Sequence, residues 1–319
     1  MSHHSASSQP ALTRDYSHKS SSICPQVTPL KSVEVAIDWL SDSTEKSRTE
    51  VIETLRNEAK NLGATVRNEL TQLNLPRYKF TPELLTYYQS SRSFVFESFA
   101  WNTTRSKEIL RSRVGRSLLR NHEPGSKVLC YGDGLGFDST YLALLGYEVT
   151  YYEPGEPCVR FAKRVFRENG VVVKICQDLE ELSTQKFDAI VCLDVLEHVP
   201  NPPELVASLA ERLADGGTFV AHAPFWYIHP DVSTHLVSNT RYSGRSKEIY
   251  HRSGLREVDA GFLWCPLVLK KCSNAKPRSL AAKMRIRFSQ FLLAWSRLST
   301  WPTVAVVRTV AKARPRIQI

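Results

Sequence analysis

Side chains that could move a proton stand close together in the stretch D-V-L-E-H-V-P-N-P, which begins at Asp194. Within it Glu197 and His198 are neighbours, and an imidazole can take a proton near neutral pH. A further histidine, His235, lies in a segment from Phe225 to Gly244 that is rich in polar aromatic residues. We take His198, Glu197 and His235 as the catalytic candidates. The alternative for Glu197 and His198 is a pair at a helix start that only shapes a pocket wall.

A glycine-rich turn lies upstream, in the stretch KVLCYGDGLGFDSTYLALLGYEVTYYEP, residues 127–154. The apolar run 128–131 predicts a buried strand, residues 139–145 a helix, and residues 148–152 a second strand that ends on Glu153. Between the first strand and the helix stand Gly132, Gly134 and Gly136. Glycines let the backbone turn sharply and bring its N–H groups close to a ligand. The order strand, glycine turn, helix, strand and acid is that of a nucleotide-binding βαβ unit.

The spacing of the glycines distinguishes between loops that bind two different kinds of ligand. A dinucleotide loop reads G-x-G-x-x-G, and its third glycine would fall on Phe137. This chain instead reads G-x-G-x-G. That form resembles motif I of the class I S-adenosylmethionine-dependent methyltransferases. By itself the turn is also compatible with another α/β protein, so a second stretch has to decide.

The second stretch is KFDAIVCLDVLEHVPNPPELVASLAERLADGGTFVAHAP, which begins about 60 residues after the start of the first stretch. It predicts a fourth strand at 187–193, a helix at 203–213 and a fifth strand at 218–223 after a D-G-G turn. It resembles the motif IV to motif VI region of small-molecule methyltransferases, and most of all the ubiquinone-biosynthesis type of O-methyltransferase. Two segments in the right order are much more specific than one loop, although together they span under a third of the chain.

The resemblance implies an α/β fold with a Rossmann-like seven-stranded sheet, mostly parallel with an antiparallel last strand, and helices on both faces. Residues 171–176 fit the third strand, and residues 256–262 and 265–271 fit the antiparallel sixth and seventh strands. We expect a region without fixed structure at 1–30, a helical region at 31–121, the methyltransferase domain at 122–272 and a basic amphipathic tail at 273–319.

The resemblance also implies S-adenosylmethionine as the cofactor. The three glycines would receive its amino-acid end, Glu153 its ribose and Asp178 its adenine, while Asp194 would face the methionine end or the substrate. The predicted cofactor-binding set is Tyr131, Gly132, Asp133, Gly134, Gly136, Glu153, Pro154, Asp178, Leu179 and Asp194. A small-molecule hydroxyl is the expected acceptor and His198 its base. In the resembled enzymes the residues matching Asp194, Glu197 and His198 can hold a divalent cation, so magnesium assistance is a less favoured alternative to a metal-free site.

One position departs from the family pattern. Motif I usually has an acid two residues before its first glycine, and here Cys130 stands there. Asp133 could take its place, or the fold could be a degenerate binding protein without turnover. A nicotinamide oxidoreductase is disfavoured by Phe137 and by the L-E-H-V-P segment. RNA or protein acceptors are weaker alternatives, because no N-P-P-Y-type strand end is present.

Helical periodicity extends before the first strand. We expect helices at 43–75, with Gly63 as a weak point, at 82–99 and at 105–120. A further helix is expected at 244–251, after the fifth strand. Aromatic residues in this region either line a substrate pocket or, as we favour, form core between helices: Tyr87, Tyr88, Phe94, Phe96, Phe99 and Trp101.

The net charge of +10 is confined to the tail, which holds ten Lys or Arg and no acid and leaves 32 basic and 32 acidic residues elsewhere. Nucleic acid is therefore a disfavoured partner. One helical face of the tail is apolar, with Met284, Phe288, Phe291, Leu292, Trp295 and Leu298. It could lie on an anionic membrane surface or dock on the protein itself, and contact with RNA is a weaker third alternative.

The cell compartment is read from what the sequence lacks. The seven cysteines form no C-x-x-C pair, and neither a secretory leader nor a membrane-spanning run is present. We therefore expect a cytoplasmic protein, with membrane association as an option; the oligomeric state stays open.

Overall fold

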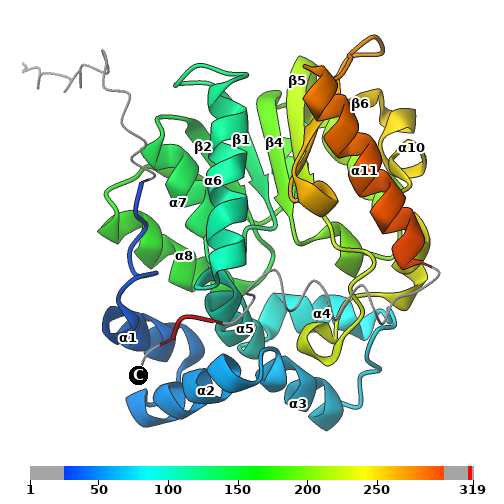
Figure 1. Ribbon diagram of the computed structural model, residues 1–319. Helices are drawn as coiled ribbons and strands as arrows, with labels where there is room; N and C mark the ends of the chain where they lie inside the picture. The colour runs from blue at the N-terminus through cyan, green and yellow to red at the C-terminus, as the bar shows by residue number, and fades with distance from the viewer. Residues whose placement is uncertain (1–24, 298–314, 318–319) are drawn as a thin grey trace, which may run out of the picture.

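A seven-stranded sheet organises the computed structural model, which describes residues 25–297 and 315–317 (Figure 1). The strand order is β3-β2-β1-β4-β5-β7-β6. Neighbouring strands run parallel except β7, which is antiparallel to both β5 and β6. The predicted fold class is therefore confirmed. The strands are β1 (Lys127–Tyr131), β2 (Glu148–Tyr152), β3 (Val173–Cys176), β4 (Phe187–Leu193), β5 (Leu213–His222), β6 (Leu255–Ala260) and β7 (Leu267–Lys271).

Helices bury both faces of this sheet, which is why the central strands are apolar without alternation. Side chains of a strand point alternately to opposite faces. Accordingly Val128 packs into one core with helices α6 (Arg105–Leu119), α7 (Phe137–Leu144) and α8 (Glu156–Glu168), whereas Leu129 packs into a second core with α9 (Pro202–Arg212). The helix predicted at 105–120 is confirmed.

In the described part of the chain five shorter helices precede α6, and here the predicted lengths are wrong. The single helix expected at 43–75 is two helices, α2 (Arg48–Lys60) and α3 (Ala64–Gln72), and a helix that was not predicted, α1 (Val33–Thr44), comes before them. Glu45 ends α1 in a left-handed conformation, and Ser47 starts α2 with a capping box to Glu50. Gly63, with φ +73°, separates α2 from α3. The helix expected at 82–99 is likewise broken by the extended Ser91 into α4 (Glu83–Ser90) and α5 (Ser93–Asn102).

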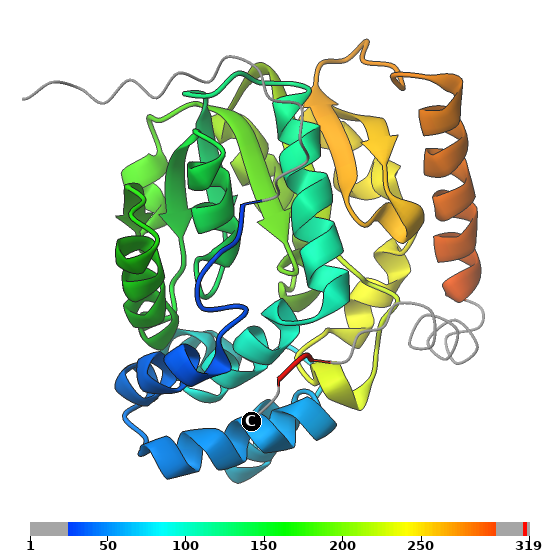
Figure 2. The same ribbon diagram turned by 60° about the vertical axis from the view of Figure 1, so that its left-hand side comes forward.

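These N-terminal helices lie together beyond the ends of the parallel strands (Figure 2). They hold the segment 225–244, which contains the short helices η3 (Pro230–Val232) and η4 (Val237–Tyr242). The backbone N–H of Tyr78 donates to the Ser233 carbonyl at 2.9 Å, and the Tyr78 carbonyl accepts from Val237 at 3.0 Å. The Arg67 guanidinium also donates to the carbonyl of Pro230. The helical region and this segment thus form one roof over the strand ends.

Three smaller expectations also needed correction. Val27 is buried in the main core, so the region without structure does not extend over residues 25–30; residues 1–24 lie outside the described part of the chain. The helix expected at 244–251 is only α10 (Ser246–Ile249) followed by η5 (His251–Ser253). Strand β5 starts at Leu213, because that residue pairs with Phe187 before a register shift absorbs the D-G-G turn.

The helix of the tail, α11 (Leu280–Ser296), docks on the body of the protein. It packs beside β6 and the short helix η6 (Phe262–Trp264) through Ala282, Ile286, Ser289, Leu293 and Ser296. Docking on the body was one of the predicted alternatives, but the predicted apolar face is not the face that docks. Leu298, which was expected to extend that face, lies outside the described residues. Within the described ranges, no helix is both long and apolar enough to cross a membrane.

Candidate functional site

The predicted site residues meet at one edge of the sheet. Parallel strands bring their carboxyl ends to the same edge, and ligands of open α/β sheets bind there. The glycine turn follows β1, Glu153 follows β2, Asp178 follows β3 and Asp194 follows β4. His222, the last residue of β5, joins them.

The glycine turn needs glycines for two different reasons. At Gly134, φ is +57° and an added Cβ would meet only the Ser98 hydroxyl, at 3.8 Å. The space beside Gly134 is therefore open, and a ligand can approach the backbone there. At Gly136, φ is +75° and a Cβ would lie 2.7 Å from the Phe166 ring and 2.8 Å from the Ala162 Cβ. That glycine lets α8 pack directly against the turn.

Asp133 caps the helix that follows the turn. Its carboxylate accepts hydrogen bonds from the backbone N–H groups of Asp138, at 3.2 Å, and Ser139, at 2.6 Å. Burial, followed by the charge of Asp138, raises the pKa of Asp133 to about 7. Cys130 is buried in β1, and burial raises the pKa of its thiol. The departure from the family pattern is thus a core thiol, with an acid three residues later that holds the turn.

Glu153 ties the turn to the end of β2. One of its carboxylate oxygens accepts from the Gly134 N–H at 2.9 Å, and the other from the Gly155 N–H at 3.0 Å. Burial raises the pKa of Glu153 to about 7 despite these two hydrogen bonds. Each carboxylate oxygen can accept a second bond, so both remain able to meet ribose hydroxyls. The rings of Tyr131 and Tyr152 stack beside this acid, 4.7 Å apart.

Asp178 lies at the rim of the edge. It is exposed, and its carboxylate accepts from the Glu180 N–H at 2.9 Å as the cap of η1 (Leu179–Leu182). Pro154 and Leu179 are half-buried. These three residues are not among those that line the cavity beside the glycine turn.

Asp194 is the centre of a polar network that sequence reasoning missed. Its carboxylate accepts from the Trp101 indole N–H at 3.0 Å, from Lys107 Nζ at 2.9 Å and from His222 Nδ1 at 2.5 Å. Burial opposes ionisation, but the charges of Lys107 and His222 hold the pKa of Asp194 well below its usual range. Lys107 also pairs with Asp138 at 3.1 Å. No local pattern marks Trp101, Lys107 or His222, because α5, α6 and β5 meet only in the folded chain.

This network forms one wall of a small cavity beside the glycine turn. The cavity has a volume of about 80 Å³. It is lined by Ser98, Trp101, Asn102, Lys107, Cys130, Tyr131, Gly132, Asp133, Gly134, Asp138, Val191, Leu193 and Asp194. Ligand pockets usually measure about 300–1,000 Å³. Helix α5 therefore closes much of the edge in this conformation.

The three catalytic candidates do come together. One donor atom from each of Glu197, His198 and His235 lies within 4.8 Å of the others. The two imidazole rings meet edge to face with centroids 4.7 Å apart. Glu197 and His198 belong to η2 (Leu196–His198), directly after β4, and His235 comes from the segment 225–244. The sequence separation of His235 gave no sign of this contact.

Backbone carbonyls fix the tautomer of both histidines. His198 Nδ1 lies 3.2 Å from the Thr234 carbonyl oxygen, and His235 Nδ1 lies 2.7 Å from that of Tyr227. A carbonyl only accepts, so each Nδ1 carries the hydrogen and each Nε2 offers a lone pair. Burial lowers the pKa of His198 to about 4 and that of His235 well below its usual range. Both rings are therefore neutral at pH 7, as a base must be.

Glu197 is the unusual member of the cluster. The side chain is 1% exposed, and neither carboxylate oxygen has a hydrogen-bond partner among the described residues. Burial, followed by the charge of Asp194, raises the pKa of Glu197 to about 8. Such a group is stabilised by a proton or by a cation. The nearest polar atom on His235, Nε2, is 3.8 Å away.

The donor set differs from the cation set expected from sequence. Asp194 is engaged by Lys107 and His222, and His235 takes its place beside Glu197 and His198. Magnesium prefers oxygen ligands, whereas two imidazoles and one carboxylate suit manganese, iron or zinc. The residues present thus fit a divalent transition metal better than magnesium.

The aromatic residues of α4 and α5 divide between core and site. Phe96 and Phe99 are fully buried in the main core, as favoured from sequence, and Tyr87 is buried in a smaller cluster. Trp101 instead binds Asp194, and the half-buried Tyr88 ring packs edge to face on His198 at 6.1 Å.

Comparison with known proteins points in the same direction as the geometry. Residues 103–249 match the family model described as a methyltransferase domain. The ubiquinone biosynthesis O-methyltransferase of Xanthomonas campestris pv. campestris (strain B100) is 36% identical over 99 residues, covering 30% of this chain and 41% of that protein. The protein of the same name from Pseudomonas syringae pv. tomato is 37% identical over 97 residues, covering 29% and 42%. Over residues 103–249 this chain is therefore similar to methyltransferases, as its glycine turn and second stretch predicted.

Solved structures of methyltransferases resemble the chain more distantly. That of magnesium protoporphyrin IX methyltransferase from Synechocystis PCC 6803 covers 60% of this chain and 97% of its own, with 19% identity and a TM-score of 0.44. That of the N-methyltransferase NodS from Bradyrhizobium japonicum covers 52% and 88%, with 16% identity and a TM-score of 0.39. The chain spans about two fifths of the length of the curated relatives it matches.

Proposed function

We propose that this protein is an enzyme that transfers a methyl group from S-adenosylmethionine to a hydroxyl of a small molecule. The proposal rests on one observation: residues that suit cofactor binding and a residue that suits proton removal lie at the same edge of the sheet. The glycine turn and Glu153 form a nucleoside-type site, and a neutral His198 with a free Nε2 lone pair stands after the neighbouring strand.

The cofactor's amino-acid end would lie at Gly134, where the surroundings are open. Lys107 lines the same cavity, and its ammonium has three donors of which Asp138 and Asp194 take two. The third donor suits the cofactor's carboxylate. Glu153 would accept from the ribose, and Asp178 and Leu179 would lie beside the adenine. This assignment gives Asp194 a supporting role, because it holds Lys107 in place.

Methyl transfer from a sulfonium is an in-line displacement, and the cofactor supplies the activated methyl group. The protein then has to align the acceptor oxygen with that carbon and remove its proton. His198 Nε2 takes the proton in this proposal. The His235 ring packs edge to face on the His198 ring, and a neutral Glu197 does not compete for that proton at pH 7.

Calorimetric titration of the protein with S-adenosylmethionine, and separately with NADH, tests the cofactor assignment. We expect micromolar binding of S-adenosylmethionine, no binding of NADH, and loss of binding in Glu153→Ala. Glu168→Ala on the outer surface of α8 is the matched control and should bind normally. NADH binding, or unchanged S-adenosylmethionine affinity in Glu153→Ala, would contradict the assignment.

A binding protein without turnover is the second candidate, and Cys130 and the narrow cavity favour it. The two candidates differ in product. Incubation with phenolic, sugar and lipid alcohols should yield S-adenosylhomocysteine with at least one acceptor. His198→Ala should lower the rate at which S-adenosylhomocysteine forms, without weakening cofactor binding. Tight cofactor binding with no product from any acceptor class would favour the binding protein.

A further inference from the structure

Helix α11 presents two different faces. Its docked face is made of small and aliphatic side chains, whereas its outer face carries a stripe of large apolar ones. With 100° per residue, the stripe covers an arc of about 80° on the side opposite the docked face. The stripe consists of Leu280, Met284, Phe288, Phe291 and Trp295, each between 56% and 73% exposed.

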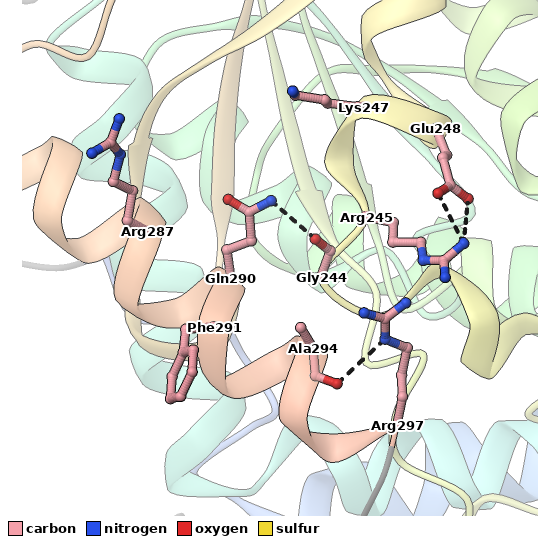
Figure 3. A pocket seen from close by; sticks show the side chains of 9 residues that line it. All are labelled: Gly244, Arg245, Lys247, Glu248, Arg287, Gln290, Phe291, Ala294 and Arg297. Atoms are coloured by element: carbon pink, nitrogen blue, oxygen red, sulfur yellow. Dashed lines mark hydrogen bonds and ion pairs between the residues drawn. The ribbon is translucent and has the colours of Figure 1, made fainter.

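A basic cavity adjoins this stripe. It has a volume of about 400 Å³ and lies between α11 and the segment around α10. Figure 3 shows Arg245 and Lys247 on the segment around α10, and Arg287 and Arg297 on α11 and at its end. Phe291 belongs both to the stripe and to the cavity wall, so the two features are continuous.

The charges of the cavity are unbalanced. Its one acid, Glu248, pairs with Arg245 at 2.9 Å. Among the described residues, no ion pair joins Lys247 or Arg287 to an acid. The sequence from residue 273 to the end holds no Asp or Glu at all. The cavity therefore contains the cationic groups of Lys247 and Arg287, which an anionic ligand would neutralise.

We propose that α11 docks this protein on an anionic phospholipid surface. The apolar stripe enters the boundary between headgroups and acyl chains, and the basic cavity takes a lipid phosphate. Tryptophan and phenylalanine beside arginine and lysine are the composition of helices that lie in a membrane interface. Basic residues near the surface add electrostatic attraction to anionic lipid. This inference does not depend on the proposed methyl transfer.

Charge selects a lipid over a second copy of the chain as the occupant. Two copies meeting through this face would oppose Lys283 and Arg287 with the same cations, and no acid of α11 could compensate them. A bilayer satisfies both needs together, because it offers apolar tails beneath negative phosphates.

Co-sedimentation of the full chain with vesicles tests the proposal. We expect strong partitioning onto vesicles of phosphatidylcholine with 30% phosphatidylglycerol and weak partitioning onto phosphatidylcholine alone, with the difference decreasing as salt rises. Phe288→Ser with Trp295→Ser should lower the partition coefficient at least tenfold. Lys247→Glu with Arg287→Glu should do so as well, since each surface cation contributes roughly a fivefold factor.

Matched controls distinguish binding through this face from nonspecific binding to lipid and from misfolding of the variants. Leu119→Ser with Val172→Ser removes exposed apolar residues elsewhere, and Lys163→Glu with Arg167→Glu reverses exposed charges on α8. Both controls should partition as the parent protein does. Thermal melting of each variant verifies that it is folded.

Three outcomes would overturn the proposal. The first is equal partitioning of the parent, the Phe288→Ser/Trp295→Ser variant and the Lys247→Glu/Arg287→Glu variant. The second is a dimer in sedimentation velocity without lipid that the stripe variant abolishes, which would make a second copy the occupant. The third is inorganic phosphate, at matched ionic strength, displacing the protein from vesicles, which would make the cavity a site for a free anion.

Discussion

At the scale of single residues, the buried Glu197 is the most informative group. Its pKa of about 8 in the folded protein lies above the ordinary value of 4.5 that it has in an unfolded chain. Between these values the folded state keeps a proton that the unfolded state releases. The stability that this group contributes is thus fully present below pH 4.5 and is lost as the pH rises to about 8.

Glu197→Gln removes this titration while keeping a neutral side chain of similar size. We expect the parent to lose stability relative to the variant as the pH rises from 5 to 8, by at most about 1.4 kcal/mol per pH unit. Unfolding in urea across this range measures the difference. Asp133 and Glu153 titrate near pH 7 in both proteins and cancel from the comparison. Parallel curves would mean that Glu197 is already charged or paired.

The same variant distinguishes a proton from a cation. If Glu197, His198 and His235 hold a divalent metal, manganese or zinc should raise the melting temperature of the parent and not that of Glu197→Gln. Magnesium should have little effect, because two of the three ligands are nitrogens. An equal shift in both proteins would place the metal elsewhere.

At the scale of elements, the close contact between the glycine turn and α8 fixes the position of the turn at the edge of the sheet. Gly136→Ala would place a Cβ against Phe166 and Ala162 in addition to straining a φ of +75°. We expect a loss of about 2–4 kcal/mol in the free energy of unfolding, from overpacking and backbone strain together. Urea unfolding measures it.

Gly170→Ala is a matched control for that prediction. Gly170 has a φ of +63°, but a Cβ there would meet nothing within 4 Å. We expect it to lose only the strain, about 1 kcal/mol. Similar losses in both variants would show that the close packing of α8 adds nothing.

At the scale of the whole molecule, we expect the roof over the strand ends to move when a cofactor binds. The cavity of about 80 Å³ is too small for a nucleoside, and α5 supplies Ser98, Trp101 and Asn102 to its wall. The segment 225–244 is held to the same roof through Tyr78. We therefore expect binding of the cofactor to be coupled to opening of the N-terminal helices.

Amide hydrogen exchange with and without S-adenosylmethionine tests this coupling. We expect saturating cofactor to slow exchange in α4 and α5, because a bound ligand suppresses the open state, and to leave α11 unchanged. Tight cofactor binding with unchanged exchange in α4 and α5 would contradict an opening roof.

The sequence by itself determined the parts of this protein that depend on interactions between residues close together in the chain. The strands, the turn at Gly132–Gly136 and the acid at Glu153 follow from local periodicity and from glycines in left-handed conformations. The helix breaks at Glu45 and Ser91 are also local, but competing helical periodicity concealed them. Only the tertiary structure decided which distant groups meet: Lys107 and His222 at Asp194, and His235 at Glu197. It also turned the apolar face of α11 outward, because small residues on the opposite face fit more closely against β6. Such contacts depend on how separate elements pack, and no spacing along the chain records that.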